Sequence, residues 1–188
     1  MFGIDSQVVR IEDVFNDEDL ILDLGGGGEG VIGQLRGRQV VAIDRRRAEL
    51  EECAQGPLKV IADAKSLPFL DETFDAETAF FFLMYVPEAD RDTVFAEAYR
   101  VLKPGGRLHV WDVTIPPQGD QPQRLFVVPV KVELPDRVIE TGYGTYWAER
   151  TLSADEIRQQ AERVGFELME SAESSPDTFH LTFQRPAS

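Results

Sequence analysis

The sequence predicts an α/β fold in which a mostly parallel sheet carries helices on both faces. Three observations predict it: apolar strand-like segments alternate with helical ones from about residue 20 to residue 113, a glycine-rich loop follows the first strong strand, and glycine or proline separates helix from strand. Strands joined through helices run parallel with right-handed crossovers. The chain of 188 residues is long enough for one substantial core, so we expect a single domain over 1–188.

The elements follow in order along the chain. The segment 1–19 is short, and its irregularly spaced apolar residues over 8–19 predict a short helix. A strand over 20–24 runs into the glycine loop, and a helix over 29–35 begins at the loop. Further strands are predicted at 39–43, 58–61, 74–83 and 107–113, and further helices at 48–54 and 88–102. Lys103-Pro104-Gly105-Gly106 ends the last of these helices.

The character of the sequence changes after Thr114. Two segments, 125–134 and 137–147, alternate in β fashion around Pro135-Asp136 and predict an inserted β-hairpin within 115–150, after the fifth strand. Ser153 and Glu156 form a capping box that begins a helix over 153–165. Two closing strands are predicted at 166–169 and 179–183. We expect the hairpin to lie on the substrate side or to form a dimer element.

Composition limits the classes of partner. With 34 Asp+Glu against 19 Lys+Arg, the formal net charge of −15 repels phosphate backbones and gives no support for nucleic-acid binding. We see no apolar run near the ~20 residues of a membrane helix, and no signal peptide at the start. The single Cys53 fits a cytoplasmic protein, and two histidines and one cysteine show no metal-ligand spacing, so we expect no metal.

The glycine run and the acids after it point to a nucleotide-like ligand. Gly25, Gly27 and Gly30 satisfy G-x-G-x-x-G, and Asp44 follows about 20 residues on, which is typical of a dinucleotide site. Asp23 opposes that interpretation, because a carboxylate beneath the loop would repel a pyrophosphate. The same carboxylate suits a ligand that carries an ammonium and a sulfonium. Asp63, after the third strand, is placed to accept a hydrogen bond from an exocyclic amine.

At these residues the chain resembles the class I S-adenosylmethionine-dependent methyltransferases. The resemblance spans roughly 20–114 and lies in four ordered motifs, which are Ile21-Leu22-Asp23-Leu24-Gly25-Gly26-Gly27, Val41-Ala42-Ile43-Asp44, Asp63-Ala64-Lys65-Ser66-Leu67-Pro68-Phe69 and Arg100-Val101-Leu102-Lys103-Pro104-Gly105-Gly106. Thr73-Phe74-Asp75 also resembles the entry to the family's fourth strand. It implies a Rossmann-like, seven-stranded sheet, S-adenosylmethionine as the cofactor, and methyl transfer. One departure is Glu29, where the family pattern places glycine. Glu29 either pairs with the ligand's ammonium or favours the helix N-terminus through its dipole, and we prefer the second interpretation.

The resemblance also implies site residues. Asp23 would order the loop and face the methionine ammonium, Asp44 would accept from both ribose hydroxyls, and Asp63 would accept from adenine N6. The other cofactor-binding residues that we predict are Gly25, Gly26, Gly27, Arg45, Ala64, Ala79 and Phe80. The aromatic run 80–85 is expected to supply part of an apolar pocket, with at least two of its residues in the core.

The residues of the reaction itself are less defined. Tyr85 and Asp112 are the candidates for a catalytic role, whereas His109 is expected in the core. Tyr143, Tyr146 and Trp147 would roof the site or form a homodimer contact through 124–147. The acceptor is expected to be a small molecule. Two other functions stay open: a non-catalytic S-adenosylmethionine-binding module, which would explain the lack of an identifiable base, and an NAD(P)-dependent oxidoreductase.

Overall fold

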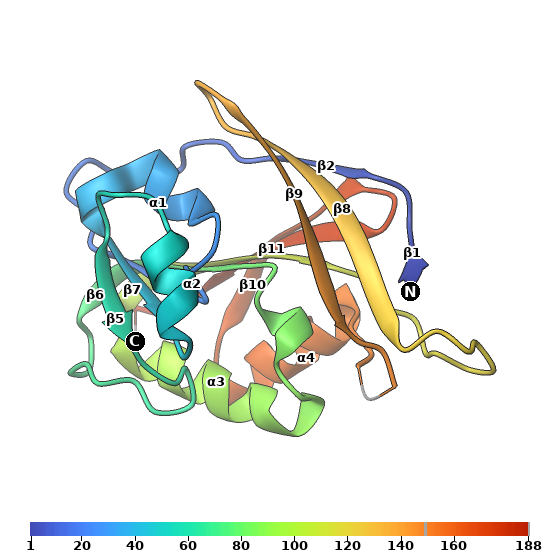
Figure 1. Ribbon diagram of the computed structural model, residues 1–188. Coiled ribbons are helices and arrows are strands. Elements are labelled where there is room, and N and C mark those ends of the chain that lie inside the picture. The colour runs from blue at the N-terminus through green and yellow to red at the C-terminus, as the bar shows by residue number, and fades with distance from the viewer. Residues whose placement is uncertain (149, 188) are drawn as a thin grey trace.

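Two β-sheets lie over one another in the fold, and helices flank the larger one (Figure 1). The computed structural model describes residues 1–148 and 150–187. The larger sheet has seven strands, and the smaller sheet has four. Among the described residues, no helix is both long and apolar enough to cross a membrane.

The larger sheet contains the strands that the sequence predicts around the glycine loop. Its strands in spatial order are β10 (Glu167–Ser175), β11 (Thr178–Gln184), β7 (Leu102–Val113), β6 (Phe74–Phe80), β3 (Ile21–Leu24), β4 (Val40–Asp44) and β5 (Leu58–Ile61). Every residue of β3 is buried, as is every residue of β4 except Asp44. Buried strands of this kind are typical of a parallel sheet covered on both faces.

The prediction of a mostly parallel sheet is wrong, because the sheet is mixed. The five strands from β7 to β5 are paired in parallel, whereas β11 runs antiparallel to both β7 and β10. The reason is local: only residues 176 and 177 separate β10 from β11. A connection this short joins antiparallel strands, since parallel neighbours need a long crossover.

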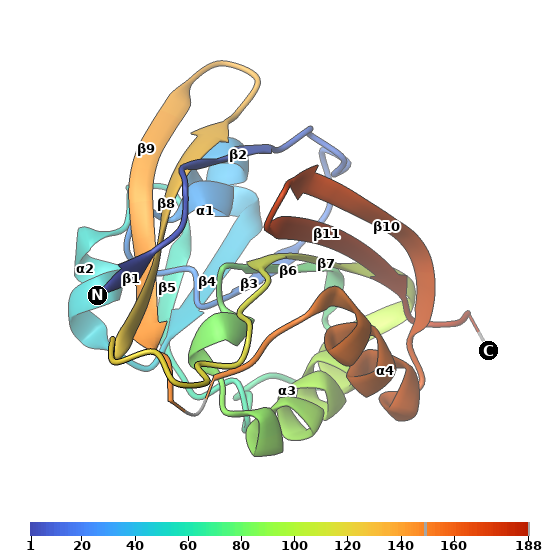
Figure 2. The ribbon, with the colours of Figure 1, turned by 90° about the vertical axis from the view of Figure 1, so that its right-hand side faces the viewer.

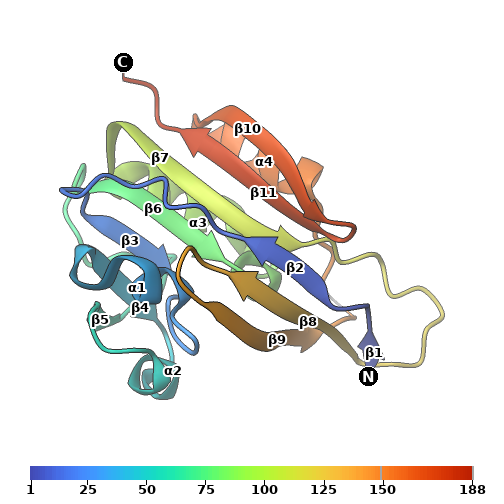
Figure 3. The same cartoon turned by 90° about the horizontal axis from the view of Figure 1, so that it is seen from above.

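Helices lie on both sides of this sheet. They are α1 (Val31–Arg36), α2 (Arg47–Glu52), α3 (Glu88–Val101) and α4 (Ala154–Val164), with the 3₁₀ turns η1 (Gly37–Gln39) and η2 (Leu83–Tyr85). Figure 3 shows α3 and α4 behind the sheet, and α1 in front. The predicted capping box is present, because Glu156 N donates to Ser153 Oγ at 3.3 Å. Each predicted helix between residues 29 and 165 therefore forms, with ends shifted by one or two residues.

The smaller sheet crosses the front of the larger one (Figures 1 and 3). The hairpin strands β8 (Leu125–Glu133) and β9 (Val138–Tyr146) are antiparallel, and β1 (Phe2–Gly3) and β2 (Gln7–Arg10) join β8 in parallel. The side view in Figure 2 shows the hairpin extending beyond β2. The inner face of β8 is fully buried through Phe126, Val128, Val130 and Val132. Hydrophobic burial therefore fixes this sheet on the domain.

The predicted helix over 8–19 is wrong. Residues 7–10 form strand β2, in which buried Gln7 and Val9 alternate with exposed Val8 and Arg10. This period of two is the strand pattern, and valine favours strands because its side chain is branched at Cβ. The residues after β2 form no helix before β3 begins at Ile21.

Candidate functional site

A cavity of about 1060 Å³ opens where β3, β4 and β5 end, the edge at which open α/β sheets bind ligands. The glycine loop, the start of α2, the segment after β6 and strand β9 form its walls. The predicted cofactor residues that line the cavity are Asp23, Gly25, Gly26, Gly27, Asp44, Arg45, Asp63, Ala64 and Phe80. Ala79, also predicted, is buried and does not line it.

The glycine loop is held tightly against its neighbours. Gly26 N donates to Ile43 O at 3.0 Å, and Gly28 N donates to Glu49 O at 2.9 Å. A Cβ on Gly27 would lie 2.5 Å from Glu49 Cβ and 3.0 Å from Asp44 Oδ2. Gly25 has a φ of +72°, which side chains rarely adopt. The glycines therefore let the backbone pass between the end of β4 and helix α2.

Asp23 lies directly beneath this loop. Its side chain is buried, and Thr78 Oγ1 donates to its Oδ1 at 2.7 Å. Asp23 Oδ2 is 2.5 Å from the place that a Cβ on Gly26 would take, so the carboxyl supports the loop closely. Burial raises the pKa of Asp23 to about 7, although the Thr78 hydrogen bond acts to lower it. A cationic ligand group above the loop would favour the charged form.

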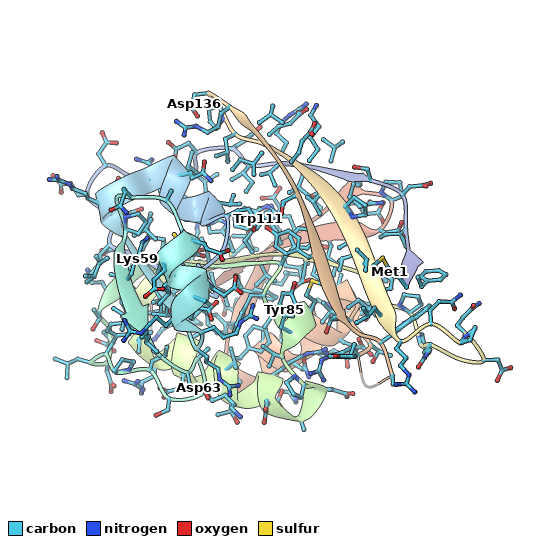
Figure 4. The ribbon with its side chains drawn as sticks, in the orientation of Figure 1. Met1, Lys59, Asp63, Tyr85, Trp111 and Asp136 are labelled. Carbon is cyan, nitrogen blue, oxygen red and sulfur yellow. The ribbon has the colours of Figure 1, made fainter. Side chains whose placement is uncertain are left out.

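The acids at the next two strand ends face the same cavity. Asp44 is the last residue of β4, and its Oδ1 accepts from Arg46 N at 2.7 Å. Asp63 follows β5; its Oδ1 accepts from Lys65 N at 3.0 Å, and its Oδ2 lies 3.7 Å from Arg45 Nε. Each acid thus uses one oxygen to order its own turn. Asp63 is labelled in Figure 4, near the lower end of β5.

The aromatic run after β6 divides between cavity and core. Phe80, Phe81, Phe82 and Tyr85 line the cavity, whereas Leu83 and Met84 are fully buried. Tyr85 Oη accepts from Gly144 N of β9 at 3.3 Å, and burial raises its pKa, so the phenol stays protonated near neutral pH. Figure 4 shows Tyr85 between the larger sheet and the hairpin. The run therefore supplies part of the cavity wall and part of the core.

Asp112 is not brought to the cavity. It is fully buried, and its carboxylate accepts from Val113 N at 2.9 Å and from Met84 N at 3.2 Å. Burial raises the pKa of Asp112 to about 7, although the hydrogen bonds from the backbone act to lower it. Asp112 therefore fixes turn η2, which carries Tyr85, and has no access to a substrate in this geometry. His109 is buried as expected and stacks on Trp111, and burial lowers its pKa to about 3.

Replacing Asp112 by asparagine is expected to remove part of the pH dependence of stability. The folded-state pKa is about 7 against an ordinary value of 3.8, so the folded protein keeps a proton that the unfolded chain releases. Stability from this group is fully present below pH 3.8 and is lost as the pH rises to about 7. The free energy of unfolding falls by at most about 1.4 kcal/mol for each pH unit in this range.

Urea unfolding of the native protein and Asp112→Asn at several pH values between these limits measures the difference. Because Asp23 and the histidines are the same in both proteins, that difference reports Asp112. Parallel pH profiles of the two proteins would contradict a buried, protonated Asp112.

Strand β9 forms the wall opposite the cofactor loop. Tyr143 and Tyr146 line the cavity, whereas Trp147 is buried and packs on Phe2 with ring centroids 4.5 Å apart. Two other residues that line the cavity make contacts that the sequence does not predict. Glu29 precedes Gly30, the N-cap of α1, and accepts hydrogen bonds from Thr141 and Tyr143 of β9, a contact that its two expected roles do not include. Glu49 of α2 packs against Gly27, and the sequence contains no local signal for this contact.

Comparison with known proteins agrees with this geometry. A family model described as a methyltransferase domain matches residues 22–110, the part that contains β3 to β7 and the glycine loop. This part of the chain is thus similar to a methyltransferase domain. The family resemblance predicted from the four motifs is therefore confirmed.

The curated relatives that the chain matches differ in identity and in the share of each chain that the match covers. A ubiquinone/menaquinone biosynthesis C-methyltransferase from Desulfotalea psychrophila is 42% identical over 106 residues, 51% of this chain and 42% of that protein. Methyltransferase GfsG from Streptomyces halstedii is 33% identical over 145 residues, 76% of this chain and 46% of that protein. The match thus spans less than half the length of these curated relatives.

A solved S-adenosylmethionine-dependent methyltransferase from Methanosarcina mazei shares the fold. Its TM-score is 0.70 at 20% identity, and the match covers 93% of this chain and 95% of that one. The similarity to methyltransferases implies S-adenosylmethionine as the cofactor, and the residues present fit it. The fit rests on the glycine loop that lines the cavity, where Gly26 and Gly27 leave no room for a Cβ against Asp23 and Glu49, and on the acids that border the cavity.

Proposed function

We propose that this chain transfers a methyl group from S-adenosylmethionine to a small-molecule acceptor. One observation carries the proposal: the acids at the ends of β3, β4 and β5 and the glycine loop between them open into one cavity. An anionic dinucleotide would meet the Asp23 carboxyl beneath the loop, whereas the cationic methionyl and sulfonium groups are attracted to it. The curated relatives include small-molecule methyltransferases by name, which supports this class of acceptor.

The cofactor roles follow from position. We assign Asp23 to ordering the loop below the methionyl group and Asp44 to the ribose hydroxyls. Asp63, with Ala64 beside it, would take the adenine edge, and Arg45 would hold Asp63 by their ion pair. The backbone of Gly25 to Gly27 would contact the ligand closely. Phe80, rather than Ala79, borders the methyl-donor end, because Phe80 lines the cavity and Ala79 does not.

The bound cofactor supplies an electrophilic methyl group on sulfur. The chain's own contribution is positioning and exclusion of water, and good alignment lowers a barrier by up to ~7–11 kcal/mol. Phe80, Phe81 and Tyr143 make the wall beside that end apolar, and Tyr85 lies close by. We propose Tyr85 as a hydrogen-bond partner of the acceptor, since its raised pKa keeps its proton.

One observation favours a second candidate, a non-catalytic S-adenosylmethionine-binding module. Neither predicted catalytic residue is free to take a proton: Asp112 lies in the core, and the Tyr85 hydroxyl is occupied by Gly144 N. Methyl transfer needs no base when the nucleophile arrives deprotonated, so this observation does not displace the first proposal. Release of S-adenosylhomocysteine with any acceptor would decide between the two.

Thermal unfolding in the presence of S-adenosylhomocysteine and of NAD tests the ligand. We expect S-adenosylhomocysteine at about 100 times its dissociation constant to add about 2.7 kcal/mol, which raises Tm by roughly 5–10 °C, while NAD at the same concentration leaves Tm unchanged. A shift with NAD and none with S-adenosylhomocysteine would overturn the proposed ligand in favour of an oxidoreductase.

The assembly and place of the protein are also proposals. We treat 1–188 as one methyltransferase domain with a leading segment 1–19 and an inserted hairpin at 115–150, of which residue 149 lies outside the described part. We propose a homodimer through 124–147, since the hairpin exposes the large hydrophobic side chains of Leu125, Val138 and Tyr146. A single cysteine, the buried Cys53, leaves no partner for an intrachain disulfide, which supports a cytoplasmic location.

A further inference from the structure

Glu29 reaches from the glycine loop to a strand that is far away in the sequence. Thr141 Oγ1 donates to Glu29 Oε1, and Tyr143 Oη donates to Glu29 Oε2 at 3.5 Å. Both partners lie on β9, 112 and 114 residues further along the chain. The family pattern has glycine at this position, so the link to β9 comes from a departure of this chain from its family.

Two other contacts hold the same stretch of β9. The Tyr143 ring stacks on Phe81, with ring centroids 4.7 Å apart and planes at 17°. Gly144 N donates to Tyr85 Oη at 3.3 Å. Segment 141–144, which we call the clasp, is therefore held by the glycine loop, by the residue after β6 and by turn η2.

The backbone at Phe81 is unusual and serves this contact. Phe81 has a φ of +48°, a conformation that disfavours a bulky side chain. It is maintained because Phe81 N donates to Trp111 O at 2.8 Å and because the ring is buried. Strained backbone that persists in a binding site points to a functional constraint. Here the strained residue carries the ring on which Tyr143 packs.

We propose that Glu29 is a positioning residue that holds the clasp of β9 over the cofactor cavity. Through Glu29, the loop that cradles the cofactor and the strand that forms the acceptor-side wall are ordered together. Glu29 is then not a ligand of the cofactor's ammonium, and the acceptor-side wall loosens when its carboxylate is removed. The inference rests on the proposed function only in taking this cavity as the cofactor site.

Hydrogen–deuterium exchange of the ligand-free chain tests the clasp directly. We expect Glu29→Gly and Glu29→Gln to raise amide exchange in peptides covering 138–146, by about tenfold for the glycine variant, because hydrogen bonds to a carboxylate are lost. Thr141→Val combined with Tyr143→Phe should raise exchange in the same peptides from the partner side. Glu140→Gln is the matched control, since Glu140 lies on β9 but on its exposed face.

Calorimetric titration with S-adenosylhomocysteine separates the two roles of Glu29. The proposal predicts that Glu29→Gln changes the affinity less than about threefold while exchange in β9 rises. It is overturned if the affinity falls tenfold or more with β9 exchange unchanged, or if Glu140→Gln raises exchange as much as the Glu29 variants. Should the native protein bind no S-adenosylhomocysteine, the proposed function fails, while the exchange comparison still decides whether the clasp exists.

Discussion

Replacement of Asp44 by alanine is expected to weaken binding of S-adenosylhomocysteine by about 100-fold. Asp44 ends β4 at the cavity, and we assign its carboxylate to both ribose hydroxyls. A hydrogen bond to a charged group contributes about 1.5–3 kcal/mol, and the half-buried position of Asp44 places the pair near 3 kcal/mol in total. That value corresponds to about two orders of magnitude in the dissociation constant.

Titration calorimetry measures the effect, and the chain offers a matched control. Glu51 is an exposed acid of α2 that does not line the cavity, so Glu51→Gln tests the general effect of removing one nearby charge. We expect Glu51→Gln to bind as the native protein does, and Asp44→Asn to lie between the native protein and Asp44→Ala. Equal losses in Glu51→Gln and Asp44→Ala would contradict a direct contact between Asp44 and the ribose.

The substitution Gly27→Ala is expected to abolish measurable binding. A methyl group at this position would lie 2.5 Å from Glu49 Cβ and 3.1 Å from the Glu49 carbonyl carbon, so the loop or α2 must move. Overpacking of this kind costs about 1–3 kcal/mol of stability. Displacement of the loop also withdraws the backbone that contacts the ligand, so the loss of binding should exceed the loss of stability.

Urea unfolding and titration of the same samples separate those two losses. Gly3→Ala is the control, because Gly3 has no unusual φ and the nearest atom to an added Cβ is 3.9 Å away. We expect Gly3→Ala to have the same free energy of unfolding and the same affinity for S-adenosylhomocysteine as the native protein, within error. A Gly27→Ala protein that binds S-adenosylhomocysteine at native affinity would show that the loop does not cradle the ligand.

The cofactor side of the site could be predicted from sequence because its signals are local. Asp44 ends an apolar strand, Asp23 lies one residue before the end of another, and Asp63 follows a third. Parallel strands end at one edge of their sheet. The positions and directions of the strands are enough to place these three acids at the same edge of the sheet. All three acids border the cavity.

The contacts that hold the acceptor side together could not be predicted, because they are long-range. Residues 7–10 pair with β8, which lies more than 120 residues further along the chain. The local pattern of residues 8–19 contains no signal that predicts this pairing. Glu29 finds its hydroxyl partners across a comparable separation. The contact therefore depends on how the two sheets pack, which the order of motifs along the chain does not specify.

The catalytic role predicted for Asp112 fails for a different reason, which is the face of the sheet on which its side chain lies. Its position near the end of β7 is consistent with the site, but strand residues alternate between faces. Trp111 packs toward Phe80, and Asp112 consequently points to the opposite side, beneath η2. The position of Asp112 in the strand therefore predicts the correct edge of the sheet for its side chain but not the face on which it lies.

A crystal structure of the protein with S-adenosylhomocysteine tests the central claim most directly. The ligand is expected in the cavity between the glycine loop and β9, with its ribose hydroxyls on the Asp44 carboxylate, its adenine edge at Asp63 and its sulfur beside Phe80. A ligand bound elsewhere, or bound in this cavity with its ribose away from Asp44, would contradict the account.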